Sequence, residues 1–326
     1  MSSFKKIRKN IKYSLLVAAI KMLLVVIPLL PRKIAMKLFG SLGAFAFRVM
    51  KQERSKAINN LNIAYGREKS QAEIHAMARE VFVNLGKSGA EFAIRMGQKK
   101  PEQFFENLEV RGAEHIQEAV DKGRGILGLI SHMGSWECTA LSVPMLEFGV
   151  PAYAIGKKLG NEQLNKLLFE SRGKKGVQTL ARGASYKTIL RVLSENNLVG
   201  ILIDQDTDVR GMFVDFFGKP AYTPIGAAML AMDSGAPVLP VFYLKKPDDT
   251  YEFIIDEEIP LVKTGNRRRD MEESTRLFHA VIEKYIKKYP TQWVWMHNRW
   301  KTTPEMVEEK KQQKAQRQAA QQKATQ

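Results

Sequence analysis

Two different patterns of apolar and polar residues divide this chain at about residue 105. Before that point, residues 34 to 97 carry apolar side chains at helical intervals and show no strand-like alternation, which is typical of packed helices. Ser70 stands three residues before Glu73, the spacing of a capping box at the start of a helix. We therefore expect a layer of helices over residues 34–100.

After that point, short apolar runs alternate with stretches of helical periodicity. The runs predict strands with the sequences NLEVRG, GILGLIS, PAYAIG, VQTL, LVGILID and PVLPVFYL, and DDTYEFIIDEEI predicts one more at an edge of the sheet. The stretches between them predict helices with the sequences AEHIQEAVDKG, SWECTALSVPMLEFG, NEQLNKLLFESRG, SYKTILRVLSENN and PIGAAMLAMDSG, and residues 270–288 predict a closing helix. This alternation indicates an α/β fold with a mixed, largely parallel sheet and helices on both faces.

The two ends of the chain differ from this core in composition. After Pro304 the sequence is rich in Gln, Ala and Lys and has no large apolar anchors, which is typical of a solvated helix or a disordered tail. We therefore expect a membrane-anchoring segment at residues 1–33, a domain at 34–304 with its α/β core at 105–304, and a tail at 305–326.

The first segment combines basic residues with an apolar run. From Tyr13 to Ile27 the run has 15 residues, about 22 Å of helix against a bilayer core of about 30 Å, which is short for a full span. A cleaved signal peptide is an alternative, but no small-x-small site follows, and the next residues are Pro31, Arg32 and Lys33. An ordinary buried helix is another. We expect a helical anchor that lies in or partly enters the membrane, with its basic residues near anionic headgroups.

The net charge indicates which classes of partner the chain binds, and the cysteine content indicates whether its compartment is reducing. The chain has 51 Lys and Arg against 34 Asp and Glu, a net charge of +17, which favours an anionic partner such as an acidic lipid surface, a phosphorylated substrate or a nucleic acid. No basic-aromatic interleaving typical of a nucleic-acid module is present, so we expect an anionic membrane surface and no nucleic acid. The single cysteine, Cys138, excludes an intramolecular disulfide framework and favours a reducing compartment.

Directly after the apolar run GILGLI, His132 precedes Glu137 by five residues. On one continuous helix this offset turns the two side chains about 140° apart, so they can meet only if His132 lies on a turn and Glu137 in the first helical turn after it. Ser131, Gly134 and Ser135 favour such a turn. A carboxylate bonded to one imidazole nitrogen fixes the tautomer and leaves the other nitrogen as a general base. With no protein nucleophile in this pattern, the nucleophile would be a substrate hydroxyl that His132 activates for attack on an acyl carbonyl.

Two neighbouring side chains are alternative nucleophiles. Cys138 is turned about 100° from Glu137 on a helix, and strand alternation would point Ser131 away from His132. These orientations do not favour either residue, but a hydrolase that uses Ser131 or Cys138 stays an alternative. Metal catalysis is not favoured, because the other histidines form no cluster with His132 in the sequence.

The stretch SHMGSWE resembles the first block of the lysophospholipid acyltransferase superfamily. More narrowly, it is similar to the late acyltransferases of lipid A biosynthesis, whose typical version is HxGNWE, with Ser135 here in place of Asn. Three further stretches resemble blocks of that group in the right order: ESRGKKG, LVGILIDQDTDVRGMFVDFFGKPAYTPIGAAMLAMDSGAPVLPVF, and YPTQWVWMHNRWK. Together the blocks cover roughly residues 105–303.

The resemblance implies a glycerolipid-acyltransferase-like αβα sandwich that moves a fatty acyl chain from an acyl thioester to a membrane glycolipid. The donor would be acyl carrier protein or coenzyme A, and the acceptor a hydroxyl of a lipid A precursor. His132 would be the general base and Glu137 its orienting carboxylate, without a metal or other cofactor. The site of action would be the cytoplasmic face of the bacterial inner membrane. The same chemistry on another glycolipid or lysophospholipid, such as a phosphatidylinositol mannoside, and a non-catalytic basic membrane-binding protein are the alternatives.

Further residues are candidates for substrate binding. Asp204 and Asp206 end an apolar run, and ligands in open α/β sheets bind at the carboxyl ends of strands. Lys158, Arg172 and Arg182 precede them and have the side chains that suit a phosphorylated headgroup or the phosphopantetheine of the donor. The tryptophans near the end, Trp293, Trp295 and Trp300, predict either an interfacial belt or part of the core.

Overall fold

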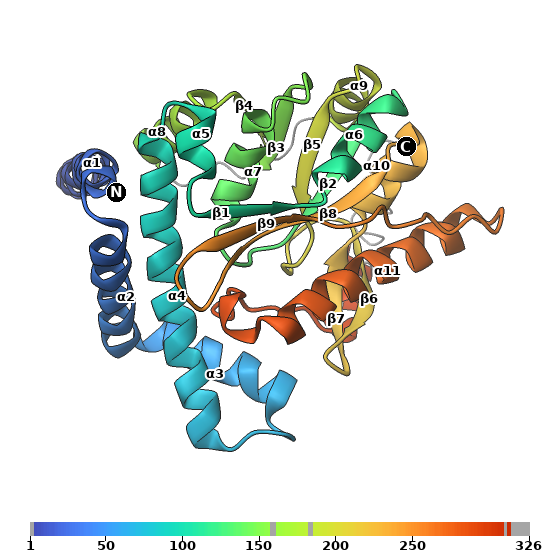
Figure 1. Ribbon diagram of the computed structural model, residues 1–326. Coiled ribbons are helices and arrows are strands. Elements are labelled where there is room, and N and C mark those ends of the chain that lie inside the picture. Colours follow the sequence, from blue (N-terminus) through green and yellow to red (C-terminus); the bar gives the residue numbers. More distant parts are fainter. Residues whose placement is uncertain (1–2, 157–160, 182–184, 310–311, 314–326) are drawn as a thin grey trace.

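The computed structural model describes residues 3–156, 161–181, 185–309 and 312–313 (Figure 1). Its main sheet has seven strands in the order β1-β9-β8-β2-β5-β3-β4. The strands are β1 Leu108–Arg111, β2 Ile126–Ile130, β3 Ala152–Gly156, β4 Val177–Ala181, β5 Leu198–Leu202, β8 Val238–Lys245 and β9 Tyr251–Ile255. Those from β8 to β4 are parallel to one another, whereas β9 is antiparallel to β8 and parallel to β1. The predicted α/β fold with a mixed, largely parallel sheet is confirmed.

Each apolar run predicted to be a strand forms part of this sheet, but one lies in a different place. The segment expected at an edge is β9, which pairs with β8 on one side and with β1 on the other. Every residue of β9 is buried, and Leu108 of β1 lies opposite Tyr251. The edge assignment is therefore wrong, because β1 covers the side of β9 that was expected to face solvent.

A two-stranded sheet, β6 Gly211–Phe216 and β7 Lys219–Pro224, was not predicted. The two strands are antiparallel and join through Phe217 and Gly218, both with positive φ angles, 54° and 71°. A two-residue turn of this kind matches the twist of the strands that it joins. The hairpin contacts α11 (Arg267–Lys288).

Helices cover both faces of the main sheet. One face packs against α9 (Tyr186–Ser194), α10 (Gly226–Ser234) and α11, and the other against α6 (Ala113–Asp121) and α7 (Trp136–Met145). Side chains of a strand alternate between the two faces. On β2, Leu127 and Leu129 enter the first core and Ile126 the second.

The helices expected before the core are α2 (Arg32–Val49), α3 (Lys51–Tyr65) and α4 (Gln71–Gly97), followed by the short α5 (Pro101–Phe105). The capping box is present, with Ser70 as the N-cap of α4 and Glu73 bonded back to it. Helix α4 is the long upright helix that lies beside α2, between α2 and the main sheet (Figure 1). The two helices approach closely at Gly43, where a Cβ atom would lie 2.1 Å from the carbonyl oxygen of Phe82.

The chain begins with α1 (Ser3–Val26) and a 3₁₀ turn, Ile27–Leu29. Residues Ile11–Leu29 are long and apolar enough to cross a membrane, judged by length and composition, and only 6% of that stretch is buried in the protein. In Figure 1 α1 is seen nearly end-on, whereas α2 runs down the same side of the molecule. Helix α1 also contacts α8 (Glu162–Gly173), where Ser14 and Gln163 are hydrogen-bonded. The N-terminal helix is therefore apolar, exposed and held against the domain at its side.

Candidate active site

His132 lies on a turn between a strand and a helix, as the sequence predicted. Strand β2 ends at Ile130 and α7 begins at Trp136. Gly134 makes the turn possible, because its φ angle is 57° and a Cβ atom there would lie 2.1 Å from the carbonyl oxygen of Tyr243. The turn places His132 at the carboxyl edge of the sheet.

His132 and Asp204 are brought together by the pairing of β2 with β5. Ile130 lies opposite Leu202 in this parallel pair, so residues two positions further on also face each other. The Nδ1 atom of His132 lies 2.8 Å from Oδ1 of Asp204, and the backbone N–H of His132 donates to Oδ2 over 2.7 Å. Asp204 is fully buried, whereas the His132 side chain is 25% exposed. The pair therefore presents an imidazole that substrate can reach.

Asp204 is held in its charged form. Burial alone would raise its pKa, but the charge and hydrogen bonds of His132, together with a hydrogen bond from Trp293, lower the pKa of Asp204 well below its ordinary value. An ionised carboxylate can only accept hydrogen bonds, so Nδ1 of His132 must carry the proton that lies between them. In the neutral form of the ring, Nε2 is then the nitrogen without a proton, and it can accept one.

Glu137 has a different partner from the one expected. Its two carboxylate oxygens accept from Nη2 of Arg172, each over 2.9 Å, and Nε of Arg172 donates over 3.1 Å. Arg172 lies in the last turn of α8, and it reaches Glu137 while Asp204 takes the Nδ1 of His132. The expected contact between His132 and Glu137 is therefore not formed, and the nearby carboxylate instead joins α7 to α8.

The C-terminal segment, residues 290–302, lies against the carboxyl ends of β2 and β5. The backbone N–H of Val294 donates to the carbonyl of His132 over 3.0 Å, and the indole N–H of Trp293 donates to Oδ2 of Asp204 over 2.8 Å. Further along, Thr302 donates to Asp206 from its backbone N–H and its hydroxyl. Sequence reasoning did not recognise Trp293 and Asp204 as partners of His132, and it gave no signal for Trp293 beyond a choice between belt and core.

The remaining candidates fall into two groups. Asp206 is buried and holds Thr302, and Arg172 is occupied by Glu137 with its third nitrogen buried. Both side chains are buried, and their role in substrate binding stays a prediction. Lys158 and Arg182 lie outside the described residues. Trp293 and Trp295 belong to the core, at 1% and 0% exposure, rather than to an interfacial belt.

The two alternative nucleophiles are not placed for attack. Cys138 is fully buried, and burial raises the pKa of its thiol well above the ordinary value. Ser131 is buried, and its hydroxyl has no hydrogen-bond partner among the described residues, so it makes no bond to His132. Within the same part of the chain, no three His, Cys, Asp or Glu side chains gather as a metal site requires.

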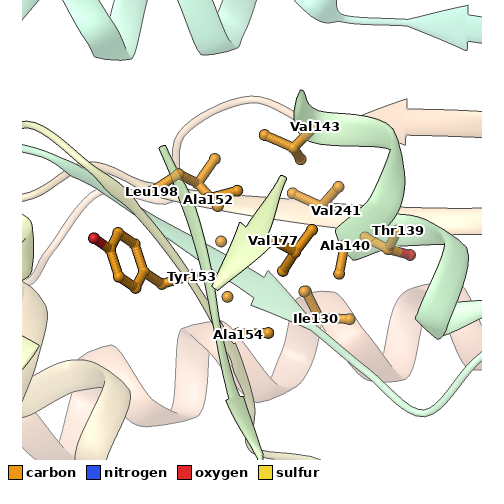
Figure 2. Close-up of a pocket in the computed structure, with 12 residues that line it drawn as sticks. Ile130, Thr139, Ala140, Val143, Ala152, Tyr153, Ala154, Val177, Leu198 and Val241 are labelled. Carbon is orange, nitrogen blue, oxygen red and sulfur yellow. The ribbon is translucent and has the colours of Figure 1, made fainter. Parts of the chain in front are cut away.

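A narrow apolar cavity lies under α7 on the neighbouring strands (Figure 2). Its volume is about 20 Å³, which is roughly the room that one water molecule needs. Gly128 of β2 and Gly200 of β5 lie opposite each other in its wall, and the other lining residues are Ile130, Thr139, Ala140, Val143, Ala152, Tyr153, Ala154, Val177, Leu198 and Val241. Ile130 in this lining is two residues before His132 in the sequence.

Comparison with known proteins adds one consistent finding. A family described as bacterial lipid A biosynthesis acyltransferase matches residues 1–302. The chain is 29% identical to the lipid A biosynthesis lauroyltransferase of Escherichia coli over 282 residues, which covers 85% of this chain and 89% of that protein. It is 27% identical to a lipid A biosynthesis acyltransferase of Haemophilus influenzae, covering 84% of this chain and 83% of the other. It is also 25% identical to a phosphatidylinositol mannoside acyltransferase of Mycolicibacterium smegmatis, covering 64% and 67%.

Proposed function

The chain belongs to the bacterial lipid A biosynthesis acyltransferase family, and on that premise we propose that it transfers a fatty acyl chain from an acyl thioester to a hydroxyl of a lipid A precursor. The observation that carries the proposal is the His132–Asp204 pair at the carboxyl edge of the sheet. It supplies a general base and no protein nucleophile, which suits direct transfer to a hydroxyl of the acceptor.

The reaction follows from the tautomer of His132. Nε2 takes the proton of the acceptor hydroxyl while the hydroxyl oxygen attacks the carbonyl carbon of the thioester. The resulting tetrahedral intermediate breaks its C–S bond, and the departing thiolate takes the proton from Nε2. During the cycle Asp204 stabilises the imidazolium without being protonated itself, as the carboxylate does in Ser-His-Asp enzymes. The products are an ester and a free thiol.

Glu137 and Arg172 would act by holding α7 and α8 in fixed positions beside the site. Their ion pair joins the first turn of α7, which follows His132, to the last turn of α8. A bidentate pair of this kind restricts both groups more than a single contact does. We therefore assign Glu137 a positioning role and give the orienting role to Asp204.

The apolar cavity is our proposed seat for the acyl chain. Its lining consists mainly of alkyl and aromatic side chains, with the hydroxyl of Thr139, around two facing glycines, and burial of alkyl groups is favourable in such surroundings. The cavity is smaller than an acyl chain, so we propose that it widens as the chain enters beside Gly128, where a Cβ atom would meet nothing closer than 3.7 Å.

The membrane side of the protein is proposed to be the face formed by α1 and α2. Five large apolar side chains of α2 are exposed at helical spacing: Ile34, Leu38, Leu42, Phe45 and Val49. They continue the exposed apolar surface of α1, and the basic side chains of Lys33, Lys37 and Arg48 are exposed on the same helix. Apolar side chains with basic neighbours suit an interface that carries anionic lipid.

The acyl donor and the cellular compartment are proposed from the net charge of the chain and from the substrates of the reaction. A net charge of +17 favours an acidic carrier and an anionic lipid, so acyl carrier protein is the preferred donor and coenzyme A the alternative. We propose the cytoplasmic face of the bacterial inner membrane as the site of the reaction, because a free cysteine and either donor suit a reducing compartment. The lipid A relatives cover more of this chain than the phosphatidylinositol mannoside relatives do, which favours a lipid A precursor over another glycolipid.

Transfer of a labelled acyl chain tests the catalytic proposal. The full chain in detergent or vesicles is given labelled acyl carrier protein or acyl coenzyme A, with a lipid A precursor or a phosphatidylinositol mannoside as acceptor. We expect a labelled lipid from wild type and from His115→Ala, a change in α6 away from the site, and none from His132→Ala. Near wild-type transfer by His132→Ala would refute the base assignment, and transfer only to phosphatidylinositol mannoside would refute the acceptor.

The membrane face is tested separately with an environment-sensitive thiol label. Because Cys138 is fully buried, a new surface cysteine is labelled selectively. Leu42 in α2 is 50% exposed and Leu277 in α11 is 40% exposed, so Leu42→Cys and Leu277→Cys make a matched pair. Anionic vesicles that contain brominated lipid should quench the label at position 42 and leave it unquenched at 277. Equal behaviour at the two positions would reject α2 as a membrane contact.

A further inference from the structure

The orientation of the Asp204 carboxylate depends on more than its contact with His132. Among the described residues, Oδ1 has one partner, Nδ1 of His132, whereas Oδ2 accepts two hydrogen bonds, from the backbone N–H of His132 and from the indole N–H of Trp293. The indole donor comes from the C-terminal segment, 89 residues away in the chain. Because Oδ2 is held by two hydrogen bonds, the carboxylate cannot turn Oδ1 away from the imidazole without breaking them.

Trp293 is itself held in place. It is 1% exposed, and its ring makes edge contacts with Phe216 and Trp295, at centroid distances of 5.5 Å and 4.7 Å. Its backbone forms an antiparallel bridge with Met133, the residue after His132. Through its backbone and its side chain, Trp293 therefore links the segment that carries His132, the carboxylate of Asp204 and the aromatic core.

We propose that Trp293 is a positioning residue for acyl transfer, whose indole N–H holds Asp204 in the orientation that keeps Nε2 of His132 free to accept a proton. The inference rests on the proposed function, because it needs His132 to be the general base. It assigns to the C-terminal segment a part in the chemistry that is separate from packing.

Removal of the indole donor should change the electrostatic interaction between Asp204 and His132. The Oδ2 atom would lose one of its two donors, and the carboxylate would place more of its charge on the bond to His132. Three charged or titratable groups interact with Asp204, namely His279 from α11 and His297 and Arg299 from the C-terminal segment, and His297 also interacts with His132. Lys301 acts in turn on His297, and Asp206, after β5, acts on Arg299. All of them remain in a variant that changes Trp293 alone, so a shift in pH dependence would report the lost donor.

The experiment compares Trp293→Phe with Trp295→Phe in the full chain. Both tryptophans are buried in the same segment, but the N–H of Trp295 donates to the carbonyl of Pro290 instead of a carboxylate. For Trp293→Phe we expect kcat to fall about 10- to 100-fold with little change in KM for the donor, and the acidic limb of the kcat/KM profile to move up by about one pH unit. For Trp295→Phe we expect the wild-type pH profile.

A third variant separates the donor from the packing. In Trp293→His the Nε2 atom takes the place of the indole Nε1 in a five-membered ring, so a donor is kept while the benzene ring is lost. It should recover much of the plateau kcat that Trp293→Phe loses. Because acid also lowers the folded fraction of a destabilised variant, the folded fraction is measured at each pH and the rate is divided by it, so that the comparison holds where a variant folds poorly.

The outcomes are distinct for the two proposals. A wild-type rate and pH profile in Trp293→Phe, or the same shift in Trp295→Phe, overturns the role of Trp293 while His132→Ala remains inactive. If His132→Ala keeps its activity, the proposed function fails first.

Discussion

Replacement of Asp204 by Asn should reverse the tautomer of His132. In the native site Oδ2 accepts from two N–H groups, the backbone of His132 and the indole of Trp293. In Asp204→Asn the side-chain oxygen must take the Oδ2 position to keep these two bonds, so the NH₂ group takes the Oδ1 position. An NH₂ group can only donate, and Nδ1 of His132 must then accept. The ring proton moves to Nε2, the atom that has to receive the proton of the substrate.

The size of the loss follows from this reversal. The equivalent Asp-to-Asn change in a Ser-His-Asp triad lowers kcat by about ten-thousand-fold through the wrong tautomer, which corresponds to about 5 kcal/mol of transition-state stabilisation. Two of the three hydrogen bonds to position 204 are kept, although each loses its charged acceptor. A charge-assisted bond is worth about 1 kcal/mol more than a neutral one, so we expect a loss of about 2 kcal/mol in the free energy of unfolding. The variant should therefore fold and be nearly inactive.

The assay is acyl transfer under saturating donor and acceptor, with the unfolding transition measured on the same sample. Glu137→Gln is the informative comparison, because a histidine–glutamate pair would suffer the same tautomer reversal in that variant instead. The structure predicts that Asp204→Asn is the more damaging of the two by at least a hundredfold. If Asp204→Asn keeps more than a tenth of the activity, or Glu137→Gln is the more damaging, the assignment of the orienting carboxylate is refuted.

Three other changes have defined outcomes. Glu137→Gln leaves the Arg172 guanidinium, 10% exposed, without its charged partner, so the free energy of unfolding in urea should fall by more than the about 1 kcal/mol of a surface pair and less than the about 3–5 kcal/mol of a buried one. Gly128→Val places a side chain in the cavity, where a Cβ atom meets nothing closer than 3.7 Å, and competition among acyl thioesters should show a shift toward shorter chains. Burial and nearby cations lower the pKa of His297 from 6.5 to about 4, and burial and Arg299 lower the pKa of His279 well below 6.5. Both rings take up protons on unfolding in this range, so stability should fall from pH 6.5 toward pH 4 by up to about 1.4 kcal/mol per pH unit for each histidine.

Matched changes control these three measurements. Glu118→Gln removes an exposed acid that contacts only His115 and should leave the unfolding free energy nearly unchanged. Gly173→Ala adds a methyl group where no atom lies within 4 Å and should leave the chain-length preference as it is. His297→Gln should make the pH dependence of unfolding shallower, and a slope equal to that of wild type would contradict the buried, neutral state of this ring.

The apolar runs predicted the central strands because β2, β8 and β9 are buried along all or nearly all of their length, so their sequences are short runs of large apolar residues. The edge strand β1 has the sequence LEVR and is only partly buried. The hairpin of β6 and β7 was not predicted, and the reason is the sequence of its turn. Its two-residue turn needs positive φ at both positions, which usually appears as Asn-Gly or Asp-Gly. Here the turn is Phe217–Gly218, a pair that reads as part of an apolar core rather than as a turn.

The carboxylate partner of His132 was not predicted for a different reason, because its position depends on the order of the strands in the sheet. Sequence spacing could find the turn at His132 and could offer only the nearest carboxylate, Glu137, as its partner. Asp204 is 72 residues away, and its position next to His132 requires β5 to lie beside β2 with Ile130 opposite Leu202. A chain of alternating strands and helices does not specify which strands become neighbours. Once that one pairing is known, the partner follows by counting two residues past the end of each strand. In a parallel sheet, a histidine directly after a buried strand is therefore best matched with the acids that follow every other strand, before those that follow it in sequence.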